Sequence, residues 1–282
     1  MDVMPRKIAK IITPQAVVEG AGVRLKRSIA TRTLDYLDPF LLLDHFQSKN
    51  PADYEAGFPL HPHRGIETVT YLLEGAVRHR DTLGNSGEIG AGDIQWMTAG
   101  RGIMHEEMPQ VRPEGVAGFQ LWVNLPAKLK MSAPRYQNIS AHQIPVLRTE
   151  SATIRVIAGT VHGVSGPISG IAADPAYLDV EVSPRTNFVH PVPRGHTAFA
   201  YVFQGSAKFG AGEQKRIDQP RLLVWTDGDT LEVKAEENPV RFLLVSGKPL
   251  HEPVARYGPF VMNTREEIAQ TLQELEQGTF AT

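Results

Sequence analysis

Two short stretches of the sequence combine histidine and carboxylate residues at the spacing of metal ligands. One contains His61 and His63, separated by one residue, and the other contains His105 and Glu107, also separated by one residue. On a β-strand, residues two apart point to the same face, so each pair can face the inside of a barrel together. The same alternation sends Glu106 to the other face. We therefore predict one metal ion bound by His61, His63, His105 and Glu107.

These ligand types favour a catalytic or redox metal over a structural one. Imidazole nitrogens with one carboxylate oxygen suit Fe, Zn, Ni, Cu or Mn, and the Irving–Williams order alone favours Cu or Ni. Four ligands on an octahedral ion leave two positions open, enough for a substrate oxygen and O₂. A structural zinc site is closed and often uses thiolates, which a chain without Cys cannot supply.

The neighbouring residues have simpler interpretations. Pro62 has no N–H to donate to a β-ladder, so its strand is expected at a sheet edge or at a bulge. His45 and His79 are candidates to hydrogen-bond to the ligands. Ordinary polar roles are expected for the other histidines, His142, His162, His190, His196 and His251. Barrel core, with pocket wall as the alternative, is expected for Phe46, Phe58, Trp96, Met97 and Met104.

Short apolar runs bounded by turn residues must position the ligands. The 282 residues include 25 glycines and 21 prolines at short intervals, which is typical of many short strands. One plan occurs twice: Tyr71 is followed by Trp96, and Tyr201 by Trp225, at separations of 25 and 24 residues within similar apolar runs. The sequence therefore predicts an all-β fold of two tandem barrels.

The boundary between the barrels is expected in residues 126–145, where Lys, Ser, Pro and Gln replace the strand pattern. This gives an N-terminal barrel with the metal site, residues 1–135, and a C-terminal barrel, residues 136–282. The second is expected to end in a helix, with Thr264 as N-cap and Glu267 completing a capping box. Apolar residues at helical spacing and a terminal glycine follow, at Ile268, Leu272, Leu275 and Gly278.

The second barrel lacks the ligand types of the first. Counting back from its tyrosine puts Pro191 and Pro193 at the positions of the first two histidines. Counting forward from its tryptophan puts Lys234 and Glu236 at the other two, and His190 is one residue out of phase and should face away. We predict that the second barrel is metal-free.

Composition excludes several classes of protein. The net charge is −2 with both signs interspersed, so the chain lacks the basic stripe of a protein that binds nucleic acid directly. No apolar run approaches membrane-spanning length, and the N-terminus lacks the apolar region of a signal peptide. We expect a cytoplasmic protein that does not enter a membrane.

Five motifs together resemble the pirin family of bicupins. They cover residues 57–68, with the sequence GFPLHPHRGIET, and residues 92–102, 105–109, 119–126 and 258–263. The resemblance spans nearly the whole chain. It implies two jelly-roll barrels, with one non-haem Fe(II) at the four predicted ligands and no metal in the C-terminal cupin. Ni, Zn, Mn or Cu fit the same ligands.

The resemblance leaves one ligand open. General cupins take the carboxylate from the first motif, where Glu67 stands, four residues after His63. In pirins the carboxylate comes from the second motif, which implies Glu107. We place Glu107 on the metal and keep Glu67 as the alternative.

Pirin-like proteins divide into two functional groups. Some resemble quercetin 2,3-dioxygenases, which open a flavonol ring with O₂ and release carbon monoxide. Metal coordination lowers the pKa of a bound hydroxyl, and Glu107 could take its proton as the catalytic base. Others resemble redox-sensing regulators that bind a transcription factor or a metabolic enzyme. We favour the dioxygenase, with a flavonol and O₂ as substrates; an isomerase or storage-type cupin is a third interpretation.

Overall fold

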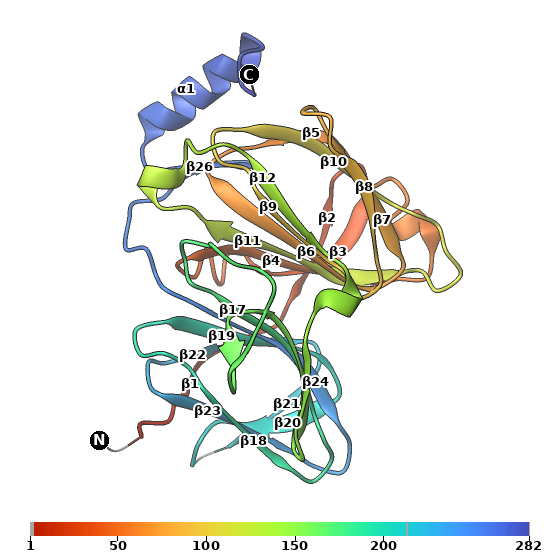
Figure 1. Ribbon diagram of the computed structural model, residues 1–282, viewed down its shortest axis with the longest axis vertical. Coiled ribbons are helices and arrows are strands. Elements are labelled where there is room, and N and C mark those ends of the chain that lie inside the picture. The colour runs from red at the N-terminus through yellow and green to blue at the C-terminus, as the bar shows by residue number, and fades with distance from the viewer. Residues whose placement is uncertain (1–2, 213, 282) are drawn as a thin grey trace. The chain divides into compact units, whose positions relative to one another are not determined.

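The computed structural model describes residues 3–212 and 214–281, and these residues form mainly β-strands (Figure 1). The chain divides into two compact units. We call Gln15–Ala141, together with the residues from Leu250 onward, the metal-site unit, because it contains the four predicted ligands. The residues up to Pro14 together with His142–Pro249 form the second unit.

The metal-site unit contains two antiparallel sheets, in the strand orders β12-β9-β6-β11-β4-β3-β2 and β5-β10-β7-β8. The larger consists of β2 (Gln15–Glu19), β3 (Val23–Ile29), β4 (Phe40–Ser48), β6 (Ile66–Glu74), β9 (Ile94–Thr98), β11 (Val116–Asn124) and β12 (Arg135–Ile139). The smaller consists of β5 (Phe58–His63), β7 (Ala76–Asp81), β8 (Ser86–Gly90) and β10 (Ile103–Pro109). Buried apolar residues of both sheets, such as Leu72 and Ile89, pack in one core cluster.

The second unit repeats this plan, with strand orders β1-β22-β19-β24-β17-β14-β13 and β18-β23-β20-β21. Its larger sheet consists of β1 (Ile8–Ile12), β13 (Val146–Arg148), β14 (Ala152–Ala158), β17 (Ala176–Val182), β19 (Thr197–Gln204), β22 (Arg221–Trp225) and β24 (Val240–Gly247). Its smaller sheet consists of β18 (Asn187–Pro191), β20 (Ser206–Phe209), β21 (Lys215–Asp218) and β23 (Thr230–Ala235). A short hairpin joins β15 (Thr160–Val161) and β16 (Val164–Ser165). The predicted repeat is confirmed, because each unit has a seven-stranded and a four-stranded sheet.

The two ends of the chain do not follow the expected division into residues 1–135 and 136–282, because each end belongs to the other unit. β1 pairs with β22 of the second unit, so it satisfies backbone groups of an edge that would otherwise be unpaired. At the other end, the residues from Leu250 onward belong to the metal-site unit. Contacts between residues distant in sequence determine which unit each chain end joins. Local composition carries no signal for such contacts.

The expected C-terminal helix is present as α1 (Arg265–Glu276). The Thr264 side chain accepts a hydrogen bond from the Glu267 N–H, and the Glu267 side chain accepts one from the Thr264 N–H, which confirms the capping box. α1 contacts β25 (Ala255–Tyr257) and β26 (Phe260–Met262), so it covers part of the metal-site unit. Three short 3₁₀ helices complete the described elements, at Pro51–Asp53, Ala127–Leu129 and Ala141–Gln143.

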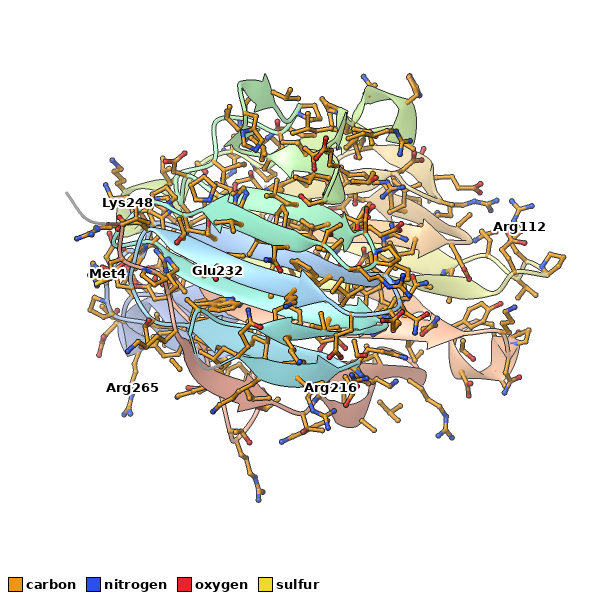
Figure 2. All side chains as sticks on the ribbon, turned by 90° about the horizontal axis from the view of Figure 1, so that it is seen from below. Met4, Arg112, Arg216, Glu232, Lys248 and Arg265 are labelled. Atoms are coloured by element: carbon orange, nitrogen blue, oxygen red, sulfur yellow. The ribbon has the colours of Figure 1, made fainter. Side chains whose placement is uncertain are left out.

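Charged side chains of both signs are spread over the strands of the second unit. Figure 2 labels Arg216 on β21 and Glu232 on β23 as examples. Within the described residues, no helix is long and apolar enough to cross a membrane.

Candidate metal centre

The four predicted ligands lie on two paired strands of the smaller sheet in the metal-site unit. β5 and β10 are antiparallel, with His61 opposite His105. Along β10, His105 and Glu107 are buried, whereas Glu106 is partly exposed and pairs with Arg80 at 3.1 Å. The predicted alternation along β10 is therefore confirmed.

Pro62 lies on an edge strand, where its missing N–H interrupts no hydrogen bond to a second neighbouring strand. β5 is the edge strand of its sheet, and the register between β5 and β10 shifts between His105 and Glu107. The edge position is one of the two alternatives expected from a proline within a strand, and the shift lies on the other side of His61 from Pro62. As a result Glu107 lies opposite Phe58 instead of opposite Pro59, where an unshifted register would place it.

The three histidines form one compact group. Their ring centroids are 4.5 Å apart for His61 and His105, 4.8 Å for His61 and His63, and 5.1 Å for His63 and His105. One potential ligand atom from each ring lies within 4.8 Å of the others. This group is the one set of three or more candidate ligand residues that meets this limit within residues 3–212 and 214–281.

The surroundings of the histidines fit a metal ion. His105 is 1% exposed, and neither of its ring nitrogens has a hydrogen-bond partner among the described residues. Such buried polar atoms are costly unless another group satisfies them. Burial lowers the pKa of His105 to about 3, and burial followed by the neighbouring His105 and His61 lowers the pKa of His63. The neutral rings that result are the form that binds metals.

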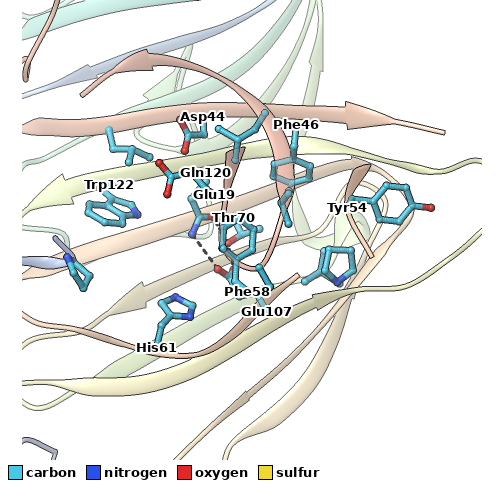
Figure 3. Close-up of a pocket in the computed structure, with 18 of the residues that line it drawn as sticks. Glu19, Asp44, Phe46, Tyr54, Phe58, His61, Thr70, Glu107, Gln120 and Trp122 are labelled. Carbon is cyan, nitrogen blue, oxygen red and sulfur yellow. Dashed lines mark hydrogen bonds between the residues drawn. The ribbon is translucent and has the colours of Figure 1, made fainter. Parts of the chain in front are cut away.

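Glu107 is not a member of this group of three, and its carboxylate is held by residues of the larger sheet. Its Oε1 accepts a hydrogen bond from Thr70 Oγ1 at 2.9 Å, and its Oε2 accepts one from Gln120 Nε2 at 3.3 Å (Figure 3). Thr70 comes from β6 and Gln120 from β11. Sequence reasoning missed both residues, because only the folded structure brings their strands over β10.

Glu67 lies in a different place from Glu107. A turn at Arg64 and Gly65 separates β5 from β6, so the even spacing between His63 and Glu67 does not place them on one face. On β6, Glu67 and Thr70 are an odd number of residues apart and so face opposite sides of the sheet. Glu67 accepts a hydrogen bond from Thr98 Oγ1 at 2.8 Å, and burial raises the pKa of its carboxyl group.

The two histidines proposed to support the ligands differ in position. His79 is buried and lies opposite Glu107 in the β7–β10 register. Burial lowers the pKa of His79, while the charges of Glu107 and Asp81 raise it. His45 stacks on Phe119 at 4.8 Å and does not line the cavity described next. Of the two, His79 is the one that lies opposite a predicted ligand.

A cavity of ≈ 570 Å³ opens beside His61, His63 and Glu107. In Figure 3, Trp122 and His61 lie toward one end of the pocket, and Phe46 and Tyr54 toward the other. Apolar residues make up much of its wall, including Val23, Leu25, Leu42, Phe46, Phe58, Val116 and Trp122. Phe46 and Phe58 thus belong to the pocket wall, whereas Trp96, Met97 and Met104 are packed in core clusters or among buried side chains, as expected.

Charged residues complete the wall of the cavity. Arg27 binds both carboxylate oxygens of Asp44, at 2.8 and 2.7 Å, and Glu19 at 2.6 Å. Arg256 reaches the cavity from the C-terminal part of the chain, together with Gly258. The motif at 258–263 is recognisable in the sequence, but nothing local in it predicts that this segment lines the pocket.

The second unit corrects one detail of the sequence count. His190 does not face away: it is buried on the same face as Phe188 and stacks on it at 5.9 Å. Pro191, which the count placed at a ligand position, lies on the exposed face of β18. The segment between β18 and β19 is longer than the one between β5 and β6, so a count back from the tyrosine changes phase. His190 lies opposite Leu231, an apolar residue that cannot bind metal.

Comparisons with known proteins agree with this architecture. The family profile described as Pirin matches residues 22–123, and the profile described as Pirin C-terminal cupin domain matches residues 177–281. The chain is 46% identical to a pirin-like protein of Caulobacter vibrioides, over 98% of this chain and 99% of that protein. It is 42% identical to a putative quercetin 2,3-dioxygenase of Pseudomonas aeruginosa, over 98% of each.

A solved structure shows the same fold. The crystal structure of a quercetin 2,3-dioxygenase from Acinetobacter baumannii matches with a TM-score of 0.88 at 33% identity, and the match covers 99% of each chain. The predicted bicupin architecture of two jelly-roll barrels with a C-terminal helix is confirmed. With both domain profiles matched and relatives similar over nearly their full length, this chain belongs to the pirin family.

Proposed function

We propose that this protein is a non-haem iron dioxygenase that opens the ring of a flavonol-like substrate with O₂. The observation that carries the proposal is a group of three histidines beside a largely apolar cavity, in which both ring nitrogens of His105 have no hydrogen-bond partner among the described residues. The names of the relatives from Pseudomonas aeruginosa and Acinetobacter baumannii support the same reaction class.

His61, His63 and His105 would hold the metal, with Glu107 as the fourth ligand. The position of Glu107 on the same strand face as His105 supports this assignment. When bound, Fe(II) supplies a redox centre for O₂ and acidifies a bound hydroxyl group. The same donors accept Ni, Zn, Mn or Cu, so the ligands alone do not select the metal. We choose iron because the proposed reaction uses O₂.

The residues of the chain would perform the remaining tasks. Glu107 takes the proton of the substrate hydroxyl as a general base, a role that its place at the cavity wall permits. Gln120 donates to one oxygen of Glu107, and the Thr70 hydroxyl proton is shared between the other oxygen and Gln120 Oε1, so the carboxylate is oriented before the substrate arrives. Phe46 and Phe58 provide apolar faces for the rings of the substrate and limit access of water. The cavity volume lies within the range of pockets for small aromatic ligands.

The test is turnover of quercetin by iron-loaded protein. Loss of the flavonol absorbance and release of carbon monoxide should occur with iron-loaded protein and stop when the metal is stripped. His105→Ala should abolish both, because it removes a ligand at the centre of the group. Flavonol loss no faster than with free iron would reject the enzyme. A partner protein captured only in one iron oxidation state would then favour the redox-sensing regulator.

A further inference from the structure

The cavity beside the histidines contains two arginines in different electrostatic situations. Arg27 is held by Asp44 through two hydrogen bonds and by Glu19 through a third. Its charge is thus neutralised at contact distance. Arg256 has no ion pair within 4.0 Å among the described residues, and its hydrogen bonds to the backbone oxygens of Leu41 and Gly258 are long, at 3.3 Å and 3.4 Å.

The Arg256 side chain is nevertheless held in place. Its guanidinium carbon lies 5.1 Å from the centroid of the Trp122 ring, a cation–π contact. The backbone bonds to Leu41 and Gly258 use Nη1 and Nε, which leaves Nη2 without a hydrogen-bond partner among the described residues. A positioned guanidinium with free donors matches the planar geometry of a carboxylate.

The Trp122 side chain lies between Arg256 and the histidines in a chain of ring contacts. The Trp122 ring lies under the Arg256 guanidinium, and its centroid is also 5.1 Å from that of His63, in an edge-on arrangement. All three residues line the same cavity. An aromatic ligand with a hydroxyl group at the histidines and an acidic group at its far end can therefore span the two positions.

We propose that Arg256 is a specificity-determining residue that binds an anionic substituent of the substrate, which makes the preferred substrate an aromatic hydroxy compound with a carboxylate group. The proposal rests on the proposed function for its choice of site and extends it to the substrate class. Flavonols without a carboxylate would be poorer ligands, because they form no charge-assisted hydrogen bond with the Arg256 guanidinium. Binding alone carries this selectivity, so it can be measured without metal and without turnover.

The probes are 6-hydroxy-2-naphthoate and its neutral analogue 6-hydroxy-2-naphthamide, which differ in charge at one end. Isothermal titration calorimetry with metal-free protein should show that the carboxylate binds about 10-fold or more tightly than the amide, as expected of a charge-assisted hydrogen bond. Arg256→Gln should remove this preference, and Arg256→Lys should keep part of it. Arg78→Gln, a change to an arginine whose side chain is 65% exposed and lies outside the cavity, should leave it intact.

The outcomes separate this proposal from the dioxygenase proposal. Equal affinity of wild-type protein for the two probes would overturn the role of Arg256, even if quercetin is degraded. A preference that persists in folded Arg256→Gln, as judged by circular dichroism, would also overturn it. A preference that depends on Arg256 would support it even if iron-loaded protein fails to open flavonols. The wild-type comparison needs no variant, so the test stands if Arg256→Gln does not fold.

Discussion

Glu106 and Glu107 are neighbours in sequence with opposite surroundings. Glu107 is buried beside the histidines, whereas Glu106 faces outward and pairs with Arg80. We predict that Glu107→Gln lowers metal affinity or turnover by about 10-fold or more, since even residues that only support ligands give 10–100-fold effects. Glu106→Gln should be nearly silent. Elemental analysis of dialysed protein and quercetin turnover measure both effects.

Glu67, the alternative carboxylate ligand, gives the result that would contradict the assignment of Glu107. If Glu67→Gln is the damaging change and Glu107→Gln the mild one, the general cupin pattern applies and our assignment is wrong. A Glu107→Gln protein that keeps its iron should bind flavonol normally but react slowly. The loss would then appear in kcat and not mainly in KM.

At this scale the sequence predicts much of the site. The alternation of a strand is local, so it correctly separates Glu107 from Glu106. It does not identify Thr70 or Gln120, whose contacts with Glu107 join different strands. The count for His190 failed because it passed through a connection whose length the alternation does not constrain.

The element that ties β5 to the C-terminal helix is the turn that follows His63. Arg64 is 3% exposed and donates hydrogen bonds to Thr271, the Phe280 carbonyl oxygen and the Arg101 carbonyl oxygen. It also pairs with Glu274 of α1 at 2.6 Å. One side chain therefore links the strand that carries two of the proposed metal ligands to a helix more than 200 residues away.

We predict that Arg64→Met destabilises the protein by about 3–5 kcal/mol, because it leaves several buried or partly buried acceptors without a donor. Metal affinity should fall as well, since His63 adjoins the disturbed turn. Urea unfolding with and without added metal measures the two effects. Arg80→Met, at a mostly exposed ion pair, is the matched control and should change stability by no more than about 1 kcal/mol. Equal effects of the two substitutions would contradict this role of Arg64.

The helix itself was predictable, but its location was not. The capping box and the spacing of Ile268 are local signals, and they predict α1 correctly. The contacts of Arg64 join residues distant in sequence, which no local pattern records. For the same reason the expected boundary at residue 135 missed the exchange of both chain ends between the units.

Across the whole molecule, buried neutral histidines make folding sensitive to acid. Burial lowers the pKa of His45 to about 3 and that of His190 to about 4, and these residues belong to different units. An unfolded histidine titrates near 6.5, so below that pH the unfolded state binds more protons than the folded state. The stability present above pH 6.5 is therefore lost as the pH falls toward the folded-state values.

We predict a loss of roughly 1 kcal/mol per pH unit for each such histidine between pH 6 and pH 5. His45→Leu and His190→Leu should each reduce the slope of unfolding free energy against pH. Urea titrations of wild type and variants at several pH values give these slopes. Slopes that are identical in wild type and both variants would show that these rings are not held neutral in the folded protein.

The difference between the two units leads us to predict one metal ion per chain. The metal-site unit holds the three-histidine group, while His190 in the second unit faces Leu231. Protein purified without oxygen should contain close to one metal per chain, and His61→Ala should lower this toward zero. Elemental analysis provides the count. Two metals per chain, or one metal that survives His61→Ala, would mean that the second unit binds metal.

The most direct test of the central claim is isotope labelling of the product. Iron-loaded protein should open quercetin under ¹⁸O₂ and place both atoms of the labelled O₂ in the ring-opened product, with carbon monoxide released alongside. Metal-stripped protein and the His105→Ala variant should yield no labelled product above the free-iron background. Ring-opened product that carries oxygen from water, or labelling that is unchanged by His105→Ala, would contradict a dioxygenase built on these histidines.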